Sequence, residues 1–133
     1  MQLARALVVP SAPMDPAAPP PSAPSPAPSF QERYAALARD WRAQLPARLE
    51  DVQARTAACG QQPGDHHALE ELYRQVHMLA GSAGTFGLAD VGDRAREMEA
   101  GLVRLMALSP RAAADFEGVR RGLEALLAAA PRD

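Results

Sequence analysis

Apolar residues recur at intervals of three and four along the chain from Tyr34 to Leu126, and this spacing restricts the fold more than any other feature of the sequence. Positions three and four apart share one face of a helix, so the pattern predicts amphipathic helices with one side turned towards a core. No segment shows the alternation of apolar and polar residues that is typical of a half-buried strand. We therefore expect an all-α fold.

The first predicted helix begins at the sequence SFQE, where Ser29 as N-cap and Glu32 three residues later form a capping box. Its apolar stripe stays in phase across Pro46, so we expect one long helix that can kink at the proline. The residues of this stripe are Tyr34, Leu37, Trp41, Leu45, Leu49, Val52 and Thr56.

Three further helices are predicted after the break at CGQQPGD. Asp65 is placed to cap the second, and Gly87 can take the left-handed conformation of its end. The fourth is expected to open with Ser109 as N-cap and Pro110 at the first helical position, and to stop at Pro131. The three stripes are Leu69, Leu72, Val76, Leu79 and Ala83; then Leu88, Val91, Ala95, Met98, Leu102 and Leu105; then Phe116, Val119, Leu123 and Leu126.

Four amphipathic helices with short connections pack most simply as an antiparallel up-down four-helix bundle. A chain of 133 residues suits one such domain, which we place at residues 29–131. Trp41, Phe86 and Phe116 are expected to supply its bulkiest packing. A core role is favoured for them because no haem, flavin or nucleotide motif accompanies these aromatic residues.

Residues 1–28 have a different composition, because Pro10 to Pro28 is a Pro/Ala/Ser tract holding nine of the 13 prolines. Such a tract lacks backbone donors and has little to bury, so it predicts a disordered tail that acts as a tether. The basic flanking residues that often fix a proline-rich ligand are missing, which disfavours docking to a proline-binding module.

The net charge of -2 comes from interspersed acids and arginines, with no basic stripe that would indicate a nucleic-acid partner. Cys59 is the single cysteine, so no internal disulfide can form and a reducing compartment is expected. The apolar run at the start is thin for a secretory signal, and no stretch approaches the length of a membrane span. These features predict a soluble cytoplasmic protein with no membrane partner.

The stretch VHMLAGSAGTFG places His77 beside small residues in the second helix. The helical period puts His77 about 110° from the centre of the apolar stripe, on a solvent-reaching flank shared with Glu70, Arg74 and Gly81. A neutral imidazole can attack phosphorus without a separate base, so the pattern suits a nucleophile that another protein can approach over Gly81. By spacing alone, an ordinary half-exposed histidine with glycines for close helix packing is an equal interpretation.

The sequence HMLAGSAGTFG resembles the phosphoacceptor motif H-x-L-K-G-S of histidine-containing phosphotransfer (HPt) domains. The family's following pattern of Leu, a small residue and LE is similar to LADVGDRAREMEAGL in this chain. The helical framework that the resemblance covers runs from Ser29 to Ala130 and leaves the tail outside. The matching positions are His77, Leu79, Gly81, Ser82, Ala83, Gly84 and Gly87.

The resemblance implies a four-helix phosphocarrier without catalytic activity, which shuttles a phosphoryl group between aspartates of receiver domains. His77 would then be the phosphorylated residue and Gly81 the small residue that admits the receiver. We also place Gly84 in the partner-docking surroundings of His77 and interpret it as a glycine for close packing. The receivers of a hybrid histidine kinase or of a response regulator would be the partners, met transiently by a monomer whose apolar patch has Met78 at its edge. The resemblance implies no cofactor for this chain, because the receiver supplies the Mg²⁺.

One position departs from the family pattern, because Ala80 stands where HPt domains commonly have a lysine. A basic group there would attract the acidic receiver surface and offset the phosphate charge. Arg74, one turn before His77 on the same flank, is the hypothetical substitute. The missing lysine keeps a second function open, namely a helical module that docks a receiver or kinase and inhibits it with His77 unphosphorylated.

Two other site classes are disfavoured. A metal site could be built from His66 and His67 with Cys59 and Glu70 or Glu71, but adjacent histidines point about 100° apart on a helix and no second cysteine completes a tetrahedral set. An autonomous enzyme is disfavoured because the sequence has no P-loop, no dinucleotide fingerprint and no nucleophile elbow. The phosphoryl group is therefore expected to come from a partner.

Overall fold

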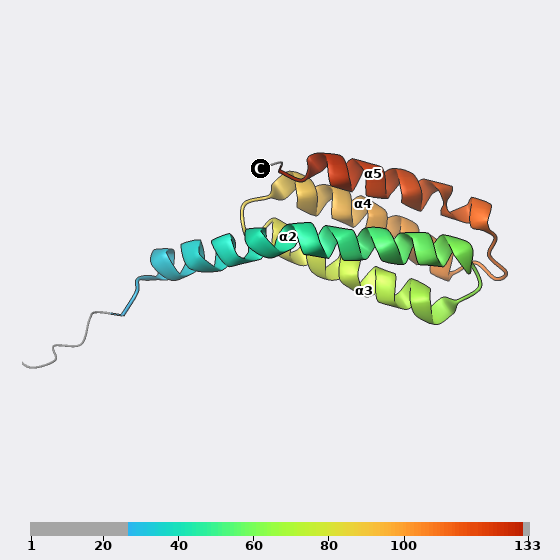
Figure 1. Ribbon diagram of the computed structural model, residues 1–133, viewed down its shortest axis with the longest axis horizontal. Coiled ribbons are helices and arrows are strands. Elements are labelled where there is room, and N and C mark those ends of the chain that lie inside the picture. The colour runs from blue at the N-terminus through green and yellow to red at the C-terminus, as the bar shows by residue number, and fades with distance from the viewer. Residues whose placement is uncertain (1–26, 132–133) are drawn as a thin grey trace, which may run out of the picture.

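The computed structural model describes residues 27–131, and over this range it is a bundle of four α-helices without strands. The helices are α2 (Phe30–Gln61), α3 (His66–Ala83), α4 (Ala89–Met106) and α5 (Glu117–Ala129), with a 3₁₀ turn, η1 (Ala113–Phe116), before the last. Figure 1 shows them side by side in an antiparallel arrangement, in which α2 packs on α3, α3 on α4, α4 on α5, and α5 back on α2. The predicted all-α bundle is confirmed, whereas the predicted tail falls almost wholly on residues 1–26, outside the described range.

The helix starts at Ser29 and Asp65 are confirmed. The Ser29 hydroxyl accepts a hydrogen bond from the amide of Glu32 at 3.1 Å, and the Asp65 carboxylate accepts one from the amide of Ala68, also at 3.1 Å. Each bond satisfies one of the amides that a helix leaves unpaired in its first turn. The first helix continues through Pro46 as one element of 32 residues, as predicted.

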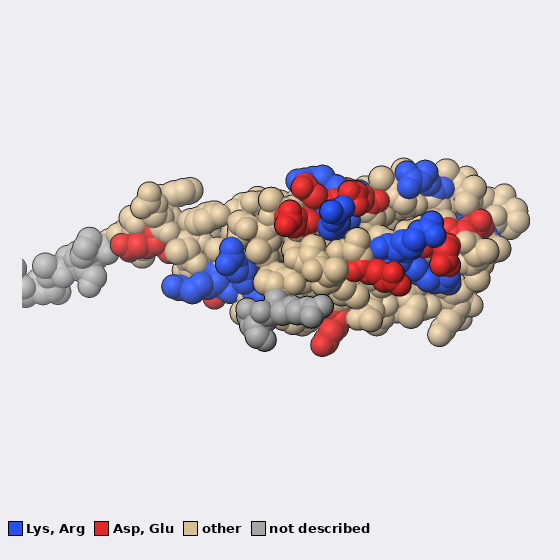
Figure 2. All heavy atoms as spheres, turned by 90° about the horizontal axis from the view of Figure 1, so that it is seen from above, with Lys and Arg blue, Asp and Glu red and all other residues tan. Residues whose placement is uncertain are grey.

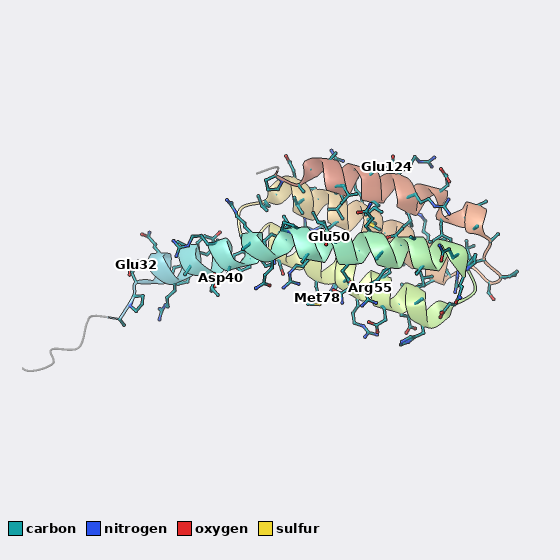
Figure 3. The ribbon with its side chains drawn as sticks, viewed as in Figure 1. Glu32, Asp40, Glu50, Arg55, Met78 and Glu124 are labelled. Atoms are coloured by element: carbon teal, nitrogen blue, oxygen red, sulfur yellow. The ribbon has the colours of Figure 1, made fainter. Side chains whose placement is uncertain are left out.

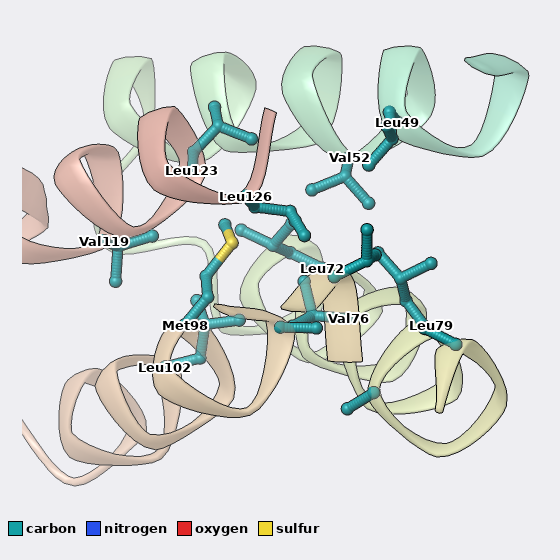
Figure 4. Close-up of a cluster of buried hydrophobic side chains, with 14 of the residues drawn as sticks. Leu49, Val52, Leu72, Val76, Leu79, Met98, Leu102, Val119, Leu123 and Leu126 are labelled. Atoms are coloured by element: carbon teal, nitrogen blue, oxygen red, sulfur yellow. The ribbon is translucent and has the colours of Figure 1, made fainter. Parts of the chain in front are cut away.

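The core contains almost all of the predicted stripe residues. Figure 4 shows side chains from all four helices meeting there, including Leu49, Leu72, Met98 and Leu123. Fully burying a side chain of this size contributes roughly 1.5–3 kcal/mol, so the stripes supply most of the energy that holds the helices together.

The aromatic residues divide between the core and one end of the bundle. Trp41 and Phe116 are buried, as predicted. Phe86 is only half-buried, because it lies at the end of the bundle with its ring 5.7 Å from that of Trp41 and 6.1 Å from that of Tyr34. Phe86 therefore closes the end of the core.

The prediction was wrong for the first turns of α2. Figure 1 shows this end of the helix projecting beyond the other three helices, so none of the other helices described between residues 27 and 131 covers its apolar side. Leu37 is 58 % exposed, and Tyr34 is covered only where its ring meets Phe86 and its hydroxyl donates to the carbonyl of Thr85. The stripe of α2 becomes core only from Trp41 onward.

The predicted start of the fourth helix at Ser109 and Pro110 was also wrong, because η1 begins at Ala113 and α5 at Glu117. The side chain of Arg111 donates to the carbonyls of Pro63 at 2.9 Å and Leu108 at 3.0 Å, which holds the connection after α4 against the loop before α3.

The start of η1 is fixed by a different side chain. The Asp115 carboxylate accepts a hydrogen bond from the amide of Ala112 at 2.8 Å, immediately before the 3₁₀ turn. These contacts, rather than a cap at Ser109, set where the last helix starts. Its predicted stripe from Phe116 to Leu126 is nevertheless buried.

The surface carries both signs of charge. Figure 2 shows acidic and basic side chains interspersed over the face in view. Many of them pair within one helix, as Arg94 does with Glu97 and Arg120 with Glu117, and exposed pairs of this kind contribute little stability. None of the helices between residues 27 and 131 combines the length and the apolar character needed to cross a membrane.

Candidate functional site

His77 lies in α3 on the edge of its apolar stripe. Val76, the residue before it, is fully buried, while the side chain of His77 is 62 % exposed. One residue turns the helix by about 100°, which accounts for this change from core to solvent. The predicted flank position of His77 is confirmed.

A carboxylate of the neighbouring helix holds one edge of the imidazole. Nδ1 of His77 contacts a carboxylate oxygen of Glu99 in α4. An ionised carboxylate only accepts hydrogen bonds, so in a neutral imidazole this contact favours the tautomer with its proton on Nδ1 and its lone pair on Nε2. The geometry thus distinguishes the two nitrogens and directs the lone pair away from Glu99.

Tyr73 covers one face of the same imidazole. The two rings are stacked with their centroids 5.7 Å apart and an interplanar angle of 17°. Tyr73 is half-buried and packs against the core, so it is a fixed surface for the histidine ring.

Gly81, one turn after His77, is exposed, and a Cβ placed on it would meet nothing within 4 Å. Its backbone does not have a positive φ, so neither packing nor conformation inside the protein requires a glycine there. The residue leaves the surface beside His77 without a side chain.

Gly84 was predicted to allow close packing, but the structure assigns that role to Gly92 of α4. A Cβ on Gly84 would meet nothing within 4 Å, whereas a Cβ on Gly92 would lie 3.3 Å from the amide nitrogen of Gly84 and 3.6 Å from Cβ of Ala83. The close approach of α3 and α4 near the site therefore depends on the absence of a side chain at Gly92.

Ala80 does not lie on the surface beside His77. It is 3 % exposed and faces α4, since its carbonyl oxygen would be 3.7 Å from a Cβ on Gly92. An alanine fits this tight crossing, and the position is part of the core. The structure thus removes Ala80 from the residues that a partner could touch.

The two remaining predicted surface residues, Arg74 and Met78, are exposed. Arg74 forms an ion pair with Glu71 at 2.7 Å, so its guanidinium is engaged within α3 and not with His77. Met78 is half-exposed, and Figure 3 shows it on α3, on the side away from α5. Both are available to a docked protein.

The end of α3 is fixed by Gly87, as predicted. Gly87 has φ of 87°, and the amides of Leu88 and Gly87 donate to the carbonyls of Ala83 at 2.8 Å and Gly84 at 3.3 Å. This pair of bonds is the Schellman arrangement that ends a helix. It turns the chain directly into α4 and so brings Glu99 opposite His77.

The residues weighed for a metal site are not gathered together. His66 pairs with Glu70 at 3.0 Å on the exposed first turns of α3, while Cys59 is buried in α2. Burial raises the pKa of the Cys59 thiol above its ordinary value, which disfavours the thiolate that would bind a metal. Among residues 27–131, no group of three or more His, Cys, Asp or Glu side chains is arranged to hold a metal ion.

Comparison with models of known protein families gives a match over most of the chain. The family model of the HPt domain matches residues 36–130, which include α3, α4, α5 and all but the first turns of α2. The chain belongs to the HPt domain family. HPt domains act in histidine phosphotransfer within phosphorelays, where they are phosphocarriers rather than catalysts and interact with receiver domains of kinases or response regulators. No curated protein and no solved structure gives a significant match.

Glu99 is the site residue that the sequence analysis of this HPt domain missed. It lies four residues after the buried Ala95 and three before the buried Leu102, which places it at the edge of the α4 stripe. The short turn at Gly87 is the sequence feature from which the position of Glu99 opposite His77 could have been predicted. A tight connection between antiparallel helices fixes which residues face each other, and counting outwards from it brings α4 near Glu99 opposite His77.

Proposed function

We propose that His77 accepts a phosphoryl group from an aspartate of one receiver domain and passes it to an aspartate of another. The single observation that carries this proposal is the placement of the imidazole. Its Nδ1 contacts Glu99, which leaves Nε2 as the nitrogen available for reaction, and the surface beside the ring is open at Gly81.

The proposed step needs no proton transfer. The Nε2 lone pair attacks phosphorus, the P–N bond forms as the P–O bond to the aspartate breaks, and the carboxylate leaves with the bonding electrons. The imidazole keeps its Nδ1 proton and gains a positive charge. Glu99 accepts the hydrogen bond of that proton, and its negative charge stabilises the ring as the charge develops. The reverse sequence delivers the phosphoryl group to the second receiver.

The residues around His77 are proposed to contact the receiver and to admit its aspartate. Gly81 gives the receiver room to bring its aspartate close to Nε2, and Met78 offers apolar surface to a weak interface that forms and separates at each transfer. Arg74 is the nearest basic residue on this flank of α3, and it can exchange its pairing with Glu71 for the acidic rim of a receiver. We assign the Mg²⁺ that neutralises charge during transfer to the receiver.

The test is incubation of the full chain with a radiolabelled phosphorylated receiver. We expect an acid-labile, alkali-stable label on the protein, which is lost in His77→Gln and kept in His66→Gln and His67→Gln, because the chain has three histidines. A label that persists in His77→Gln would refute the assignment of the residue. Binding without label for every receiver tried would instead support the inhibitory docking module.

A further inference from the structure

Tyr73 contacts His77 in a way that phosphotransfer by a lone histidine does not require. The phenol ring lies one helical turn before the imidazole, with the centroids 5.7 Å apart and the planes 17° from parallel. Tyr73 packs against the core, whereas most of the His77 side chain is exposed. The tyrosine is therefore the fixed partner of the stack and the histidine the movable one.

The contacts with Tyr73 and Glu99 restrain different motions of the imidazole. Glu99 holds the Nδ1 edge of the ring, and Tyr73 covers one face. The terminal torsion of a histidine side chain has a broad minimum, so a hydrogen bond at one edge leaves the ring free to tilt. A stacked ring underneath limits that tilt and keeps Nε2 pointing outward.

The charge of the ring changes on phosphorylation, and the stack with Tyr73 responds to it. When Nε2 gains the phosphoryl group while Nδ1 keeps its proton, the ring itself becomes an imidazolium, and the anionic phosphoryl group lies on its outer side at Nε2. A cation within about 6 Å of an aromatic centroid is attracted by the face of that ring, and the observed separation of 5.7 Å lies inside this range. The stack therefore strengthens in the phosphorylated state.

We propose that Tyr73 is a positioning residue that stabilises phosphorylated His77 relative to the free histidine and so shifts the equilibrium of phosphotransfer towards this protein. The inference rests on the proposed function. It adds a determinant of how much phosphoryl group the protein holds when a receiver and His77 reach equilibrium. The interaction uses the face of the ring and not the hydroxyl, so phenylalanine can replace tyrosine.

The test measures the ratio of phosphorylated protein to phosphorylated receiver at equilibrium. Tyr73→Leu is expected to lower the ratio about two- to fivefold, the size of an exposed cation–π contact, while Tyr73→Phe leaves it unchanged. Tyr34→Leu, at the only other tyrosine, is the matched control, because it removes an aromatic ring that contacts Phe86 and not His77. An unchanged ratio in Tyr73→Leu, or an equal loss in Tyr73→Phe, would overturn the proposal.

A second measurement separates this proposal from the proposed function. Nitrogen-15 NMR of the unphosphorylated protein reports which ring nitrogen of His77 carries the proton. We expect the Nδ1–H form in the wild type, in Tyr73→Phe and in Tyr73→Leu with unchanged helical content, because Glu99 contacts Nδ1 whereas Tyr73 contacts only a face of the ring. If no receiver labels His77, the proposed function fails whatever the NMR result. If labelling of His77 succeeds but the ratio is unchanged in Tyr73→Leu, only the role of Tyr73 fails.

Discussion

Replacing Gly81 by alanine should make the protein more stable and a poorer partner for a receiver. Glycine inside a helix costs about 1 kcal/mol relative to alanine, and the new Cβ would meet nothing within 4 Å. We therefore expect the free energy of unfolding to rise by about 1 kcal/mol, or Tm by roughly 4–8 °C for a domain of this size. Thermal and urea unfolding followed by circular dichroism would measure the gain.

The same methyl group would occupy the space through which a receiver reaches Nε2 of His77. A displacement of about 1 Å in a reacting pair can lower a rate by roughly 10²-fold, so phosphotransfer should slow by up to that factor. Gly118→Ala is the matched control, because this exposed glycine in α5 also has nothing within 4 Å of its Cβ position. A stabilised Gly81→Ala protein that transfers phosphoryl groups at the wild-type rate would refute the claim that the receiver needs the space at Gly81. A Gly81→Ala protein that is less stable than the wild type would refute the claim that the Cβ position of Gly81 is open.

Three further predictions concern Gly92, Arg74 and Cys59. Gly92→Ala should raise stability in urea unfolding less than Gly81→Ala does, because the contact of its Cβ with the amide nitrogen of Gly84 at 3.3 Å offsets the helical gain of about 1 kcal/mol. A gain equal to that of Gly81→Ala would show that α3 and α4 can separate without cost. Arg74→Ala should change the free energy of unfolding by less than about 1 kcal/mol, since the pair of Arg74 with Glu71 is exposed. The same substitution should slow phosphotransfer, and most strongly at low salt. An unchanged transfer rate at low salt would show that Arg74 is not part of the docking surface. The thiol of Cys59 should react with a disulfide reagent only after unfolding, because it is buried. Rapid labelling of Cys59 in the folded protein would contradict its burial. Because burial raises the pKa of this thiol in the folded state, its contribution to the free energy of unfolding is complete below the pKa of the unfolded thiol, about 8.5. That contribution is lost as the pH rises above this value.

The helical period predicted which face of each helix is apolar, and this was enough for the bundle. It failed at Leu37 because periodicity identifies an apolar face but not whether another helix reaches far enough to cover it. It failed at Ser109 because the capping signal is local, whereas Arg111 fixes that connection through a carbonyl 48 residues away in the chain. Both errors concern contacts between distant segments.

In the candidate site, too, local features were predicted correctly and contacts between helices were not. The flank position of His77 and the turn at Gly87 follow from local rules of helix geometry and are confirmed. Glu99 belongs to another helix and becomes visible only when the register between α3 and α4 is known. Ala80 is a different case, because its spacing of four residues from the buried Val76 already predicts a core position, and the structure agrees with that spacing.

The most direct test of His77 as a phosphocarrier is a complete relay in two stages. The full chain is phosphorylated by one receiver, separated from it, and mixed with a second, unphosphorylated receiver. We predict that label leaves the protein and appears on the second receiver, and that His77→Gln carries none at either stage while remaining folded. Label that reaches the second receiver through the His77→Gln protein would show that His77 is not the phosphocarrier.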